Sequence, residues 1–296
     1  MKYKPVKEIA NEWNISERMV RNYCSSGRIP GVVLIGKTWN IPADSKKPGR
    51  KLVKQFSNNT LLNILKEEKD SHLSGRIYHK TQIELTYNSN HIEGSTLSHE
   101  HTRYIFETNT ICFEKDCINV DDIIETSNHF KCVDYIIDNA LKPLTESMIK
   151  KFHFMLKNGT TDSRKSWFNV GGYKKFPNEV GGEETTSPKN VKLEIKKLLN
   201  NYNNIEKKTF EQILEFHKSF ESIHPFQDGN GRVGRLIMFK ECLANNIVPF
   251  IIDEEHKLFY YQGLKEWNNE KGYLIDTCLS CQDKYKLWLD YFKIKY

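Results

Sequence analysis

The sequence predicts a mainly α-helical fold preceded by a small basic module. Apolar residues recur at spacings of three and four over most of residues 58–296, as in "VDDIIETSNHFKCVDYIIDNAL" and "FEQILEFHKSFESI", and this is the period of amphipathic helices. One glycine- and proline-rich interruption, residues 171–188, carries short extended pieces. The chain has 296 residues and 38% hydrophobic content, which is enough for two domains with packed cores.

The first 47 residues show the pattern of two short helices followed by a hairpin. Val6, Ile9 and Trp13 predict a first helix, and a turn separates it from a second helix that Ser16 is expected to cap. Two β-rich runs follow in "GVVLIGKTWNIP", pinched at a Gly-Lys pair, which is typical of a hairpin.

The positive charge is concentrated near the N-terminus. The chain has 44 Lys or Arg and 38 Asp or Glu, a net charge of +6, and residues 1–50 contain ten basic against four acidic residues. The rest of the chain is therefore neutral overall, as expected for a basic module fused to a neutral body. Residues 48–58 are charged and contain Pro48 and Gly49, so they predict a linker.

The N-terminal pattern resembles the winged helix-turn-helix modules of the MerR and excisionase type over residues 1–47. The resemblance rests on "ISERMVRNYCSSGRIPG" and "GKTWNIP". It implies that the second helix enters a DNA groove, where only a few side chains read sequence. The alternative is a basic face that is merely solvated or that binds protein. The expected DNA contacts are Arg18, Arg21, Asn22 and Lys37.

The composition does not favour an exported or membrane-spanning chain. The start "MKYKPVKEIANEW" is charged, and the longest apolar runs are far below the roughly 18 residues that a bilayer requires. Seven cysteines without framework spacing indicate reduced thiols. We interpret the Cys278 and Cys281 pair as core residues rather than a metal or redox site. These observations predict a cytoplasmic protein without a membrane partner.

The densest polar cluster is "HPFQDGNGRVGR", which begins at His224. The proline that follows ends one helix, and glycines open the next, so free backbone N–H groups point into the loop. Arg232 and Arg235 lie one turn apart on one face and complete an anion site. Asp228 fits there if a divalent cation such as Mg²⁺ bridges it to a phosphate, and His224 could take a proton from a hydroxyl. The cluster predicts nucleotidyl or phosphoryl transfer to an alcohol, whereas a tight capped turn with solvated charges explains only the glycines and one arginine.

This cluster resembles the complete Fic signature, His-x-Phe-x-Asp/Glu-Gly-Asn-Gly-Arg-x-x-Arg, with every fixed position kept. The resemblance covers roughly residues 60–296 and implies a Fic-fold helical bundle with a β-hairpin flap. It also implies an enzyme that transfers AMP from ATP to a Ser, Thr or Tyr hydroxyl of a target protein, or of the chain itself, and releases pyrophosphate.

The resemblance implies a role for each residue of the cluster. His224 is the expected catalytic base, and Asp228 the expected Mg²⁺ ligand. The implied nucleotide-binding residues are Gly229, Asn230 and Gly231 at the α-phosphate, Arg232 and Arg235 at the β- and γ-phosphates, and Tyr260 at the adenine. A core role for Tyr260 is an equal alternative. We interpret His217 as a packed or hydrogen-bonded helix residue.

The same resemblance implies a function for the interruption at residues 171–188. In the family, the edge of such a flap pairs with an extended target segment, which is strand addition onto an exposed edge. The residues expected to dock a target are Asn178, Val180, Gly181 and Gly182.

An inhibitory element is expected upstream, in "TYNSNHIEGSTLS". Ser89 and Glu93 are four residues apart, so they share one helix face, and Gly94 ends the helix. The three residues resemble the Fic inhibitory motif Ser/Thr-x-x-x-Glu-Gly/Asn, in the class that places it before the catalytic motif. The resemblance implies that Glu93 pairs with Arg235 and occupies the arginine that the γ-phosphate needs.

The predicted organisation is therefore a module at 1–47, a linker at 48–58, helices with the inhibitory element at 59–110 and a Fic domain at 111–296. Candidate partners are ATP, a protein target, DNA and a second copy of the chain. Three other functions remain open: a transcription regulator that only senses nucleotide, a hydrolase that uses Glu93 to remove AMP, and a kinase-like relative. The kinase-like branch departs from the Gly-Asn-Gly sequence that this chain keeps.

Overall fold

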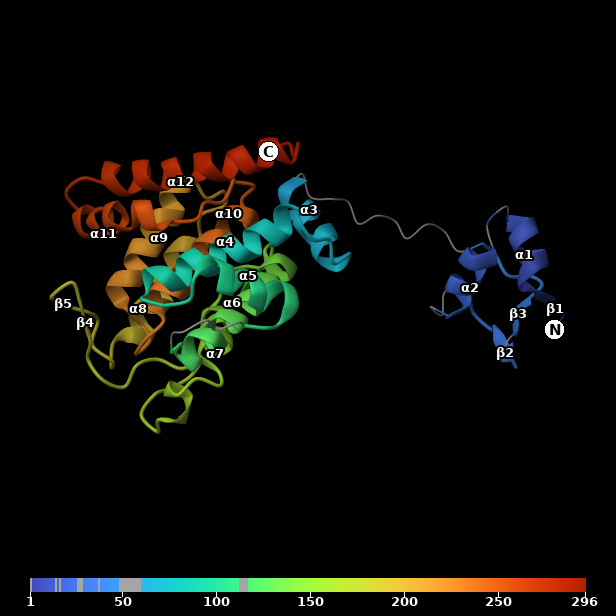
Figure 1. Ribbon diagram of the computed structural model, residues 1–296, viewed down its shortest axis with the longest axis horizontal. Helices are drawn as coiled ribbons and strands as arrows, with labels where there is room; N and C mark the ends of the chain where they lie inside the picture. The colour runs from blue at the N-terminus through green and yellow to red at the C-terminus, as the bar shows by residue number, and fades with distance from the viewer. Residues whose placement is uncertain are drawn as a thin grey trace. The chain divides into compact units, whose positions relative to one another are not determined.

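The computed structural model describes residues 2–13, 15, 17–25, 29–36, 38–47, 60–111 and 117–296, apart from the side chains of three helical residues near the N-terminus. The chain divides into two compact units, residues 1–56 and 57–296, shown in Figure 1. The division falls within the predicted linker, most of which lies outside the described residues. The predicted segments 59–110 and 111–296 lie together in the second unit.

The N-terminal unit has two helices and a three-stranded sheet. Its order along the chain is β1 (Tyr3–Pro5), α1 (Val6–Trp13), α2 (Glu17–Ser25), β2 (Val33–Ile35) and β3 (Thr38–Pro42). Strand β3 pairs antiparallel with β1 and β2, so the hairpin β2–β3 follows the two helices in the predicted order. Strand β1 was not expected from the sequence. Ser16, the expected helix cap, lies outside the described residues.

This small unit has a core of its own. Apolar side chains from both helices and from β3 pack together, because α1 and α2 each present one apolar face to the sheet. The buried residues are Val6, Ile9, Ala10, Val20, Cys24, Ile29 and Ile41.

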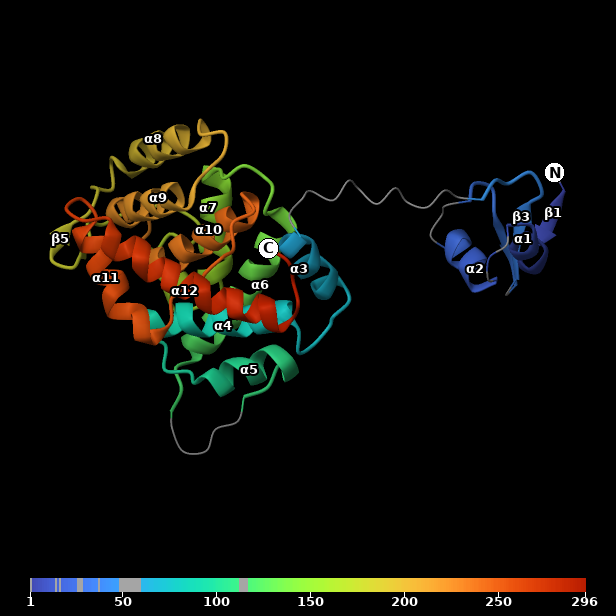
Figure 2. The same cartoon turned by 90° about the horizontal axis from the view of Figure 1, so that it is seen from above.

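The second unit is helical, which confirms the predicted mainly α fold (Figures 1 and 2). Its helices are α3 (Thr60–Asp70), α4 (Ile77–Ile92), α5 (His99–Thr108), α6 (Val120–Asn139), α7 (Glu146–Lys157), α8 (Val191–Asn203), α9 (Phe210–Ile223), α10 (Asn230–Ala244), α11 (Lys257–Glu266) and α12 (Gly272–Tyr291). Two short 3₁₀ turns, Asp162–Arg164 and Glu254–His256, join them. No helix among the described residues is long and apolar enough to cross a membrane.

Helix α10 is the central element of this unit. It packs against α4, α6, α7 and α9, and nearly all of its side chains are buried, including Arg232, Arg235 and Lys240. A helix that is buried on all faces lies inside a bundle. The N-terminus of α10, where the polar cluster lies, is therefore surrounded by other helices. Cys278 and Cys281 are buried in a neighbouring apolar cluster, as predicted.

The predicted flap is a hairpin with very short strands. Strand β4 (Glu179–Val180) pairs antiparallel with β5 (Glu183–Glu184). Gly181 and Gly182 connect the strands, with φ angles of 61° and 82°. Two consecutive positive φ angles are typical of the turns that join tight hairpins, and glycine adopts them without strain. The hairpin lies at one edge of the unit, beyond α8 and α9 (Figure 1).

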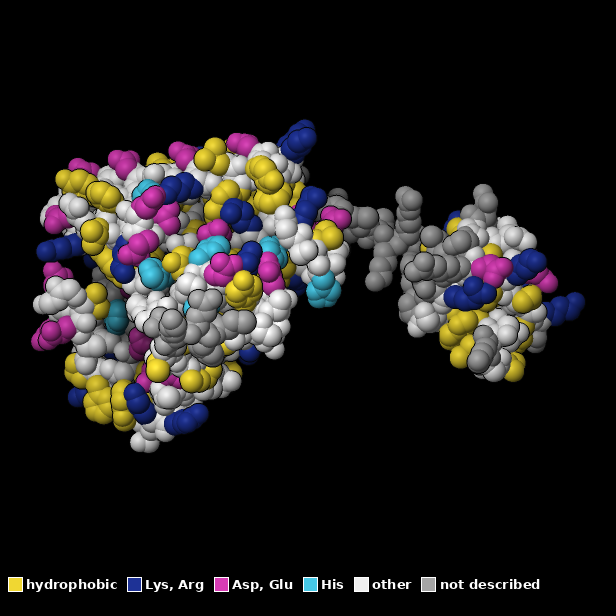
Figure 3. Space-filling view, in the orientation of Figure 1, with side chains coloured by type: hydrophobic (Ala, Val, Ile, Leu, Met, Phe, Trp, Pro, Cys, Tyr) yellow, Lys and Arg dark blue, Asp and Glu magenta, His cyan; other side chains and the backbone are white. Residues whose placement is uncertain are grey.

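Charges of both signs are interspersed over the face of the helical unit that Figure 3 shows. This mixture agrees with the neutral balance of residues 51–296, in contrast to the basic N-terminal stretch. A neutral, mixed surface gives no long-range attraction for a polyanion. Any affinity for nucleic acid is therefore expected from the N-terminal unit.

Candidate active site

The polar cluster forms a rigid loop between α9 and α10. His224 caps α9 in the left-handed conformation, with φ 49°, and its backbone N–H donates to the carbonyl of Phe220. The left-handed residue ends the helix and turns the chain, as glycine often does at this position. Gly229 also has a positive φ, 81°, and is the N-cap of α10. The N–H groups of the first turn of α10 therefore face the loop.

Phe226 and Asn230 fix the loop to the core. The Phe226 ring is fully buried and stacks on the imidazole of His153, with ring centroids 4.0 Å apart. The Asn230 side chain accepts from the Phe226 N–H at 2.8 Å and donates to its carbonyl at 2.9 Å. The carboxamide that was expected to touch the α-phosphate therefore holds the loop instead. The backbone N–H of Asn230, in the first turn of α10, takes no part in these two contacts.

His224 lies in the loop in a form suited to accept a proton. Burial, and after it the nearby Lys174 cation, lowers the pKa of its imidazole to about 4. The ring is therefore neutral at pH 7. Its side chain retains 17% exposure, so a small group can still approach it.

Arg235 is held by the residues of the expected inhibitory motif, at the C-terminal end of α4. Its Nη2 donates to Glu93 Oε1 at 2.7 Å and to the Ser89 carbonyl at 2.9 Å, and its Nε donates to Ser89 Oγ at 3.1 Å. Burial opposes the charge, but the Glu93 carboxylate outweighs it and raises the pKa of Arg235. Gly94, with φ 95°, follows Glu93, the C-cap of α4. The predicted pair between Glu93 and Arg235 is present.

Gly231 shows how closely Glu93 approaches α10. A Cβ atom built on Gly231 would lie 2.2 Å from Glu93 Oε1 and 3.0 Å from Arg235 Nη1. No side chain fits in that space without displacing the carboxylate. Glu93 therefore sits directly over the first turn of α10, where an anion would otherwise meet its N–H groups.

Arg232 lies in a buried ion cluster that sequence reasoning missed. Its Nη1 pairs with Glu125 of α6, and its Nη2 donates to Asp228 Oδ2 at 3.1 Å. Lys157, at the end of α7, contacts Glu125 Oε1 at 2.5 Å, Asp228 Oδ2 at 2.7 Å and Asp162 Oδ2 at 2.9 Å. Glu125 and Lys157 are far from the motif in sequence, and each lies within an ordinary amphipathic helix. No local signal marked them.

The position of Asp228 fits a divalent cation. Burial disfavours its ionised form, but Arg232 and Lys157 outweigh burial and hold the pKa of this carboxyl well below its usual range. Both side-chain contacts reach Oδ2, and the side chain is 48% exposed. An ionised, accessible carboxylate beside an expected phosphate site is the donor that Mg²⁺ uses.

Tyr260 is a core residue, which corrects its assignment to the adenine site. Its ring is 1% exposed, and its hydroxyl lies 2.6 Å from Nε2 of His217. A base has no free face of this ring to stack on. His217 is likewise buried and hydrogen-bonded, as interpreted from the sequence. The ring of the neighbouring Tyr261 is 42% exposed, so it offers the accessible aromatic surface that Tyr260 lacks.

The flap residues divide into an anchor and an exposed tip. Val180 and the two turn glycines are exposed, as a docking edge requires. Asn178 instead turns inward, where its Nδ2 donates to the Phe226 carbonyl at 3.1 Å. Its side chain therefore fastens the flap to the catalytic loop, and its carbonyl accepts from Thr185 Oγ1 at 2.9 Å, so Asn178 anchors the flap.

The expected DNA contacts are described in part. Arg21 is exposed on α2 and forms an ion pair with Glu17 at 2.7 Å. Helix α2 carries Arg18 and Asn22 as well, but their side chains lie outside the described parts of the structure, as does the whole of Lys37. The structure therefore describes the side chain of one of the four residues expected to contact DNA.

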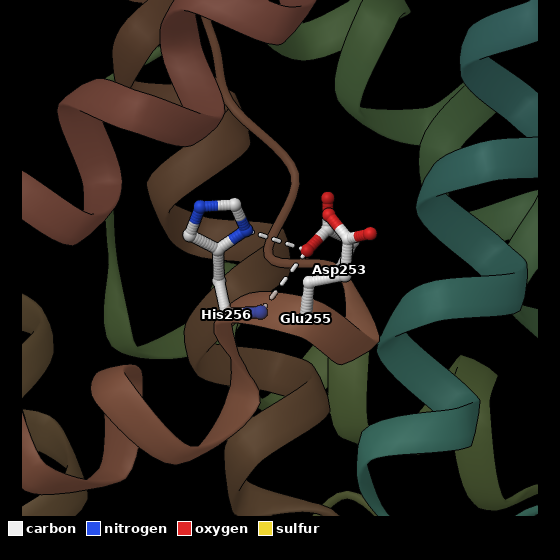
Figure 4. Close-up of side chains that lie close together, drawn as sticks. All are labelled: Asp253, Glu255 and His256. Carbon is white, nitrogen blue, oxygen red and sulfur yellow. Dashed lines mark hydrogen bonds and ion pairs between the residues drawn. The ribbon is translucent and has the colours of Figure 1, made fainter.

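One other group of potential metal ligands lies away from the loop. In the parts of the chain that the structure describes, Asp253, Glu255 and His256 alone bring three such side chains together (Figure 4). His256 Nδ1 lies 2.6 Å from Asp253 Oδ1, and Lys284 contacts both carboxylates at 2.7 Å. The Lys284 cation offsets part of their charge, and His256 bonds Asp253, so local pairing accounts for the group.

Comparison with known proteins gives a family for part of the chain. Residues 143–242 match the family described as Fic/DOC. Curated relatives include the protein adenylyltransferase Fic of Aedes aegypti, 27% identical over 195 residues that cover 63% of this chain and 37% of that protein. The protein of the same name from Drosophila grimshawi is 26% identical over 187 residues, 60% of this chain and 36% of that protein. The chain thus spans less than two fifths of the length of these relatives.

Solved structures give the fold. A Fic-domain-containing signaling protein from Bacteroides thetaiotaomicron is 25% identical, with a TM-score of 0.64 over 78% of this chain and 96% of that chain. A Fic-1 fragment from C. elegans is 19% identical, with a TM-score of 0.61 over 78% of this chain and 72% of that chain. Residues 143–242 therefore match the Fic/DOC family, and 78% of the chain has the fold of a Fic-domain protein.

Proposed function

We propose that this chain is a protein adenylyltransferase held inactive by Glu93. It transfers AMP from ATP to a Ser, Thr or Tyr hydroxyl of a target protein or of itself, and releases pyrophosphate. One observation carries the proposal: a neutral His224 and two buried arginines surround the N-terminus of α10. The names of the curated relatives support the same activity.

The chemistry assigns one task to each part of the loop. The target hydroxyl attacks the α-phosphorus, His224 takes its proton, and the bond to the β-phosphate breaks. The N–H groups of the first turn of α10 stabilise the charge on the α-phosphate, because they are already oriented toward it. The arginines at 232 and 235 hold the remaining phosphates. Asp228 would hold Mg²⁺, which would neutralise phosphate charge.

Glu93 blocks this arrangement in two ways. Its carboxylate pairs with Arg235 at 2.7 Å, so that guanidinium cannot also bind the γ-phosphate in the productive geometry. The same carboxylate lies over Gly231, where its charge repels an incoming phosphate. Removal of the carboxylate is therefore expected to make both Arg235 and the N–H groups of the first turn of α10 available to ATP.

The test is AMP transfer by the full chain. We expect Glu93→Gly, incubated with Mg²⁺ and α-labelled ATP, to gain label and one AMP by intact mass at a rate at least 10-fold above wild type. Glu93→Gly/His224→Ala should gain neither, because the base is lost. Label from γ-labelled ATP would instead show phosphate transfer. No label from either form in Glu93→Gly would contradict the proposal.

A matched pair of substitutions separates the brake from general effects on α4. Glu93→Gln keeps the size of the side chain and removes its charge, so it should raise transfer. Glu84→Gln removes a carboxylate from the same helix, where it pairs with His99 and Lys80, and should leave transfer at the wild-type rate. Equal activation by both changes would show that loosening α4, not releasing Arg235, is responsible.

We also propose that the N-terminal unit binds DNA. Two short helices followed by a hairpin, with most of the excess positive charge of the chain, support this second function. The full chain should bind duplex DNA with an affinity that falls steeply with salt. Arg21→Ala should weaken binding several-fold, whereas Lys7→Ala, an exposed change on α1, should have a smaller effect. Absence of binding at low salt would contradict this role.

A further inference from the structure

We propose that Lys174 is a positioning residue that ties the flap to the turn bearing His224. In this way Lys174 fixes the position of the flap edge, which is expected to bind a target, relative to His224, which is expected to deprotonate the target hydroxyl. The inference rests on the proposed transfer reaction. It concerns a residue outside the motif that sequence analysis did not single out.

Lys174 is a buried cation held by neutral groups. Lys174 is only 3% exposed to solvent. The ammonium donates to Asn178 Oδ1 at 2.6 Å, to Thr185 Oγ1 at 2.5 Å and to the Ile223 carbonyl at 3.4 Å. No carboxylate of a described residue forms an ion pair with it. A buried ammonium without a counter-ion is costly, so a simple packing role does not account for a lysine here.

The contacts of Lys174 bracket the base. Its ammonium binds the carbonyl of Ile223, one residue before His224, while its backbone N–H donates to the carbonyl of Pro225, one residue after, at 2.9 Å. The left-handed turn of His224 is thus held on both sides by one residue.

The same ammonium closes the base of the flap hairpin. Asn178 precedes β4 and Thr185 follows β5, and Thr185 Oγ1 also donates to the Asn178 carbonyl at 2.9 Å. Strands of two residues each provide few backbone bonds to hold a hairpin. The three donors of an ammonium, directed at separate acceptors, supply the missing connection. Movement of the flap is thereby coupled to the turn at His224.

Lys174 also sets the charge around His224. Its cation lowers the pKa of His224, whereas the Glu221 backbone and the carboxylates of Glu93 and Asp228 raise it. Burial lowers the pKa of Lys174 itself to about 8. At pH 7 the ammonium is therefore still charged and favours the neutral imidazole that a base requires.

The experiment compares Lys174→Met and Lys174→Arg in the Glu93→Gly full chain. We expect Lys174→Met to slow AMP transfer at pH 7 by 10-fold or more, to change the Kd for ATP by less than 3-fold, and to move the acid limb of the pH–rate profile upward. Lys174→Arg should restore part of the rate. Lys175→Met, the exposed neighbour, should leave both rate and profile unchanged. A rate and profile for Lys174→Met equal to those of its parent would overturn the proposal.

A second measurement does not depend on activity. In the wild-type chain, the His224 ring resonances should stay constant down to about pH 5, whereas in Lys174→Met they should begin to titrate above that pH. His224→Ala assigns the signals. Thr185→Val, which removes one acceptor and keeps the cation, should slow transfer without moving the His224 titration. The two proposals fail on different results. If Glu93→Gly transfers no AMP, the adenylyltransferase proposal fails. If the His224 titration in Lys174→Met equals that of wild type, the role of Lys174 is refuted.

Discussion

Gly231 determines, at the scale of single residues, whether Glu93 can reach Arg235. The position lies in the first turn of α10, and a methyl group there would overlap the Glu93 carboxylate at 2.2 Å. The helix itself would accept alanine, which forms helices better than glycine. The glycine is therefore required by the neighbouring carboxylate rather than by the helix backbone.

A double-mutant cycle tests this contact. In the wild-type chain, Gly231→Ala should lower the free energy of unfolding by about 1–2 kcal/mol, because Glu93 must move out of its pair with Arg235. In Glu93→Gly the same change should be neutral or slightly stabilising. Urea unfolding of the four proteins gives the coupling energy. Equal effects in both backgrounds would show that the carboxylate does not lie over Gly231.

Tyr260 allows a second test at this scale. If the ring is a core residue, Tyr260→Phe removes the hydrogen bond to His217 and leaves a buried nitrogen without its partner. The free energy of unfolding should fall by about 1–2 kcal/mol, while the Kd for ATP in Glu93→Gly/His224→Ala should change little. Tyr261→Ala is the matched change at the exposed neighbour and should weaken ATP binding more. The reverse order would restore Tyr260 to the adenine site.

At the scale of elements, a buried ion cluster joins α6, α7 and the loop before α10. Lys157 lies at its centre and contacts Glu125, Asp162 and Asp228. Opposite charges in a buried site offset the cost of desolvation only while every partner is present. The cluster therefore fixes three elements relative to one another and orients the carboxylate expected to hold Mg²⁺.

Removal of the central cation should be costly. We expect Lys157→Met to lower the free energy of unfolding by about 3 kcal/mol, because Glu125 is left buried with only Arg232 as its partner. Lys151→Met changes an exposed lysine of the same helix, and its effect should stay within about 0.5 kcal/mol. Urea denaturation followed by circular dichroism measures both. A similar small effect for both would mean that the cluster is solvated.

Sequence signals were sufficient for elements and for the local motif, but not for contacts between distant helices. The residues from His224 to Arg235 lie in one loop and the first turn of a helix, so their order alone placed them together. Glu125 and Lys157 carried no such signal, because charged residues on amphipathic helices usually face water, and Lys174 lies in a loop, where a lysine is usually exposed. Tyr260 was ambiguous for a related reason: an aromatic residue at helical spacing suits a core and a ligand site equally.

At the scale of the whole molecule, the two units have separate cores and different charge. The N-terminal unit packs around its own apolar cluster, whereas the helical unit has its own cores and buries most of the ionisable groups discussed above. The acid sensitivity of the chain is therefore expected to come from the helical unit. The lowered pKa values of its buried histidines give the size of the expected change in stability.

The stability of the helical unit should fall as the pH falls from about 6.5 to 4.5. Burial lowers the pKa of His129, His153 and His217 to about 3, whereas in the unfolded chain the value is about 6.5. The unfolded state therefore binds more protons in this window, and stability present above pH 6.5 is lost on acidification. Each histidine contributes about 1.4 kcal/mol per pH unit once its unfolded form is protonated. Glu221 acts oppositely, because burial and the Glu93 charge raise its pKa to about 8.

The pH dependence of urea unfolding, followed by circular dichroism on the full chain, tests this balance. These three histidines, together with His224, whose pKa is lowered to about 4, outweigh one glutamate, so the net slope should be positive, with lower stability at lower pH. His129→Asn should reduce that slope by about 1.4 kcal/mol per pH unit, since one proton fewer is taken up on unfolding. His72→Asn, at an exposed position, is the matched change. If the free energy of unfolding does not change between pH 6.5 and 4.5, these imidazoles are protonated inside the folded unit. That result would mean that water reaches them.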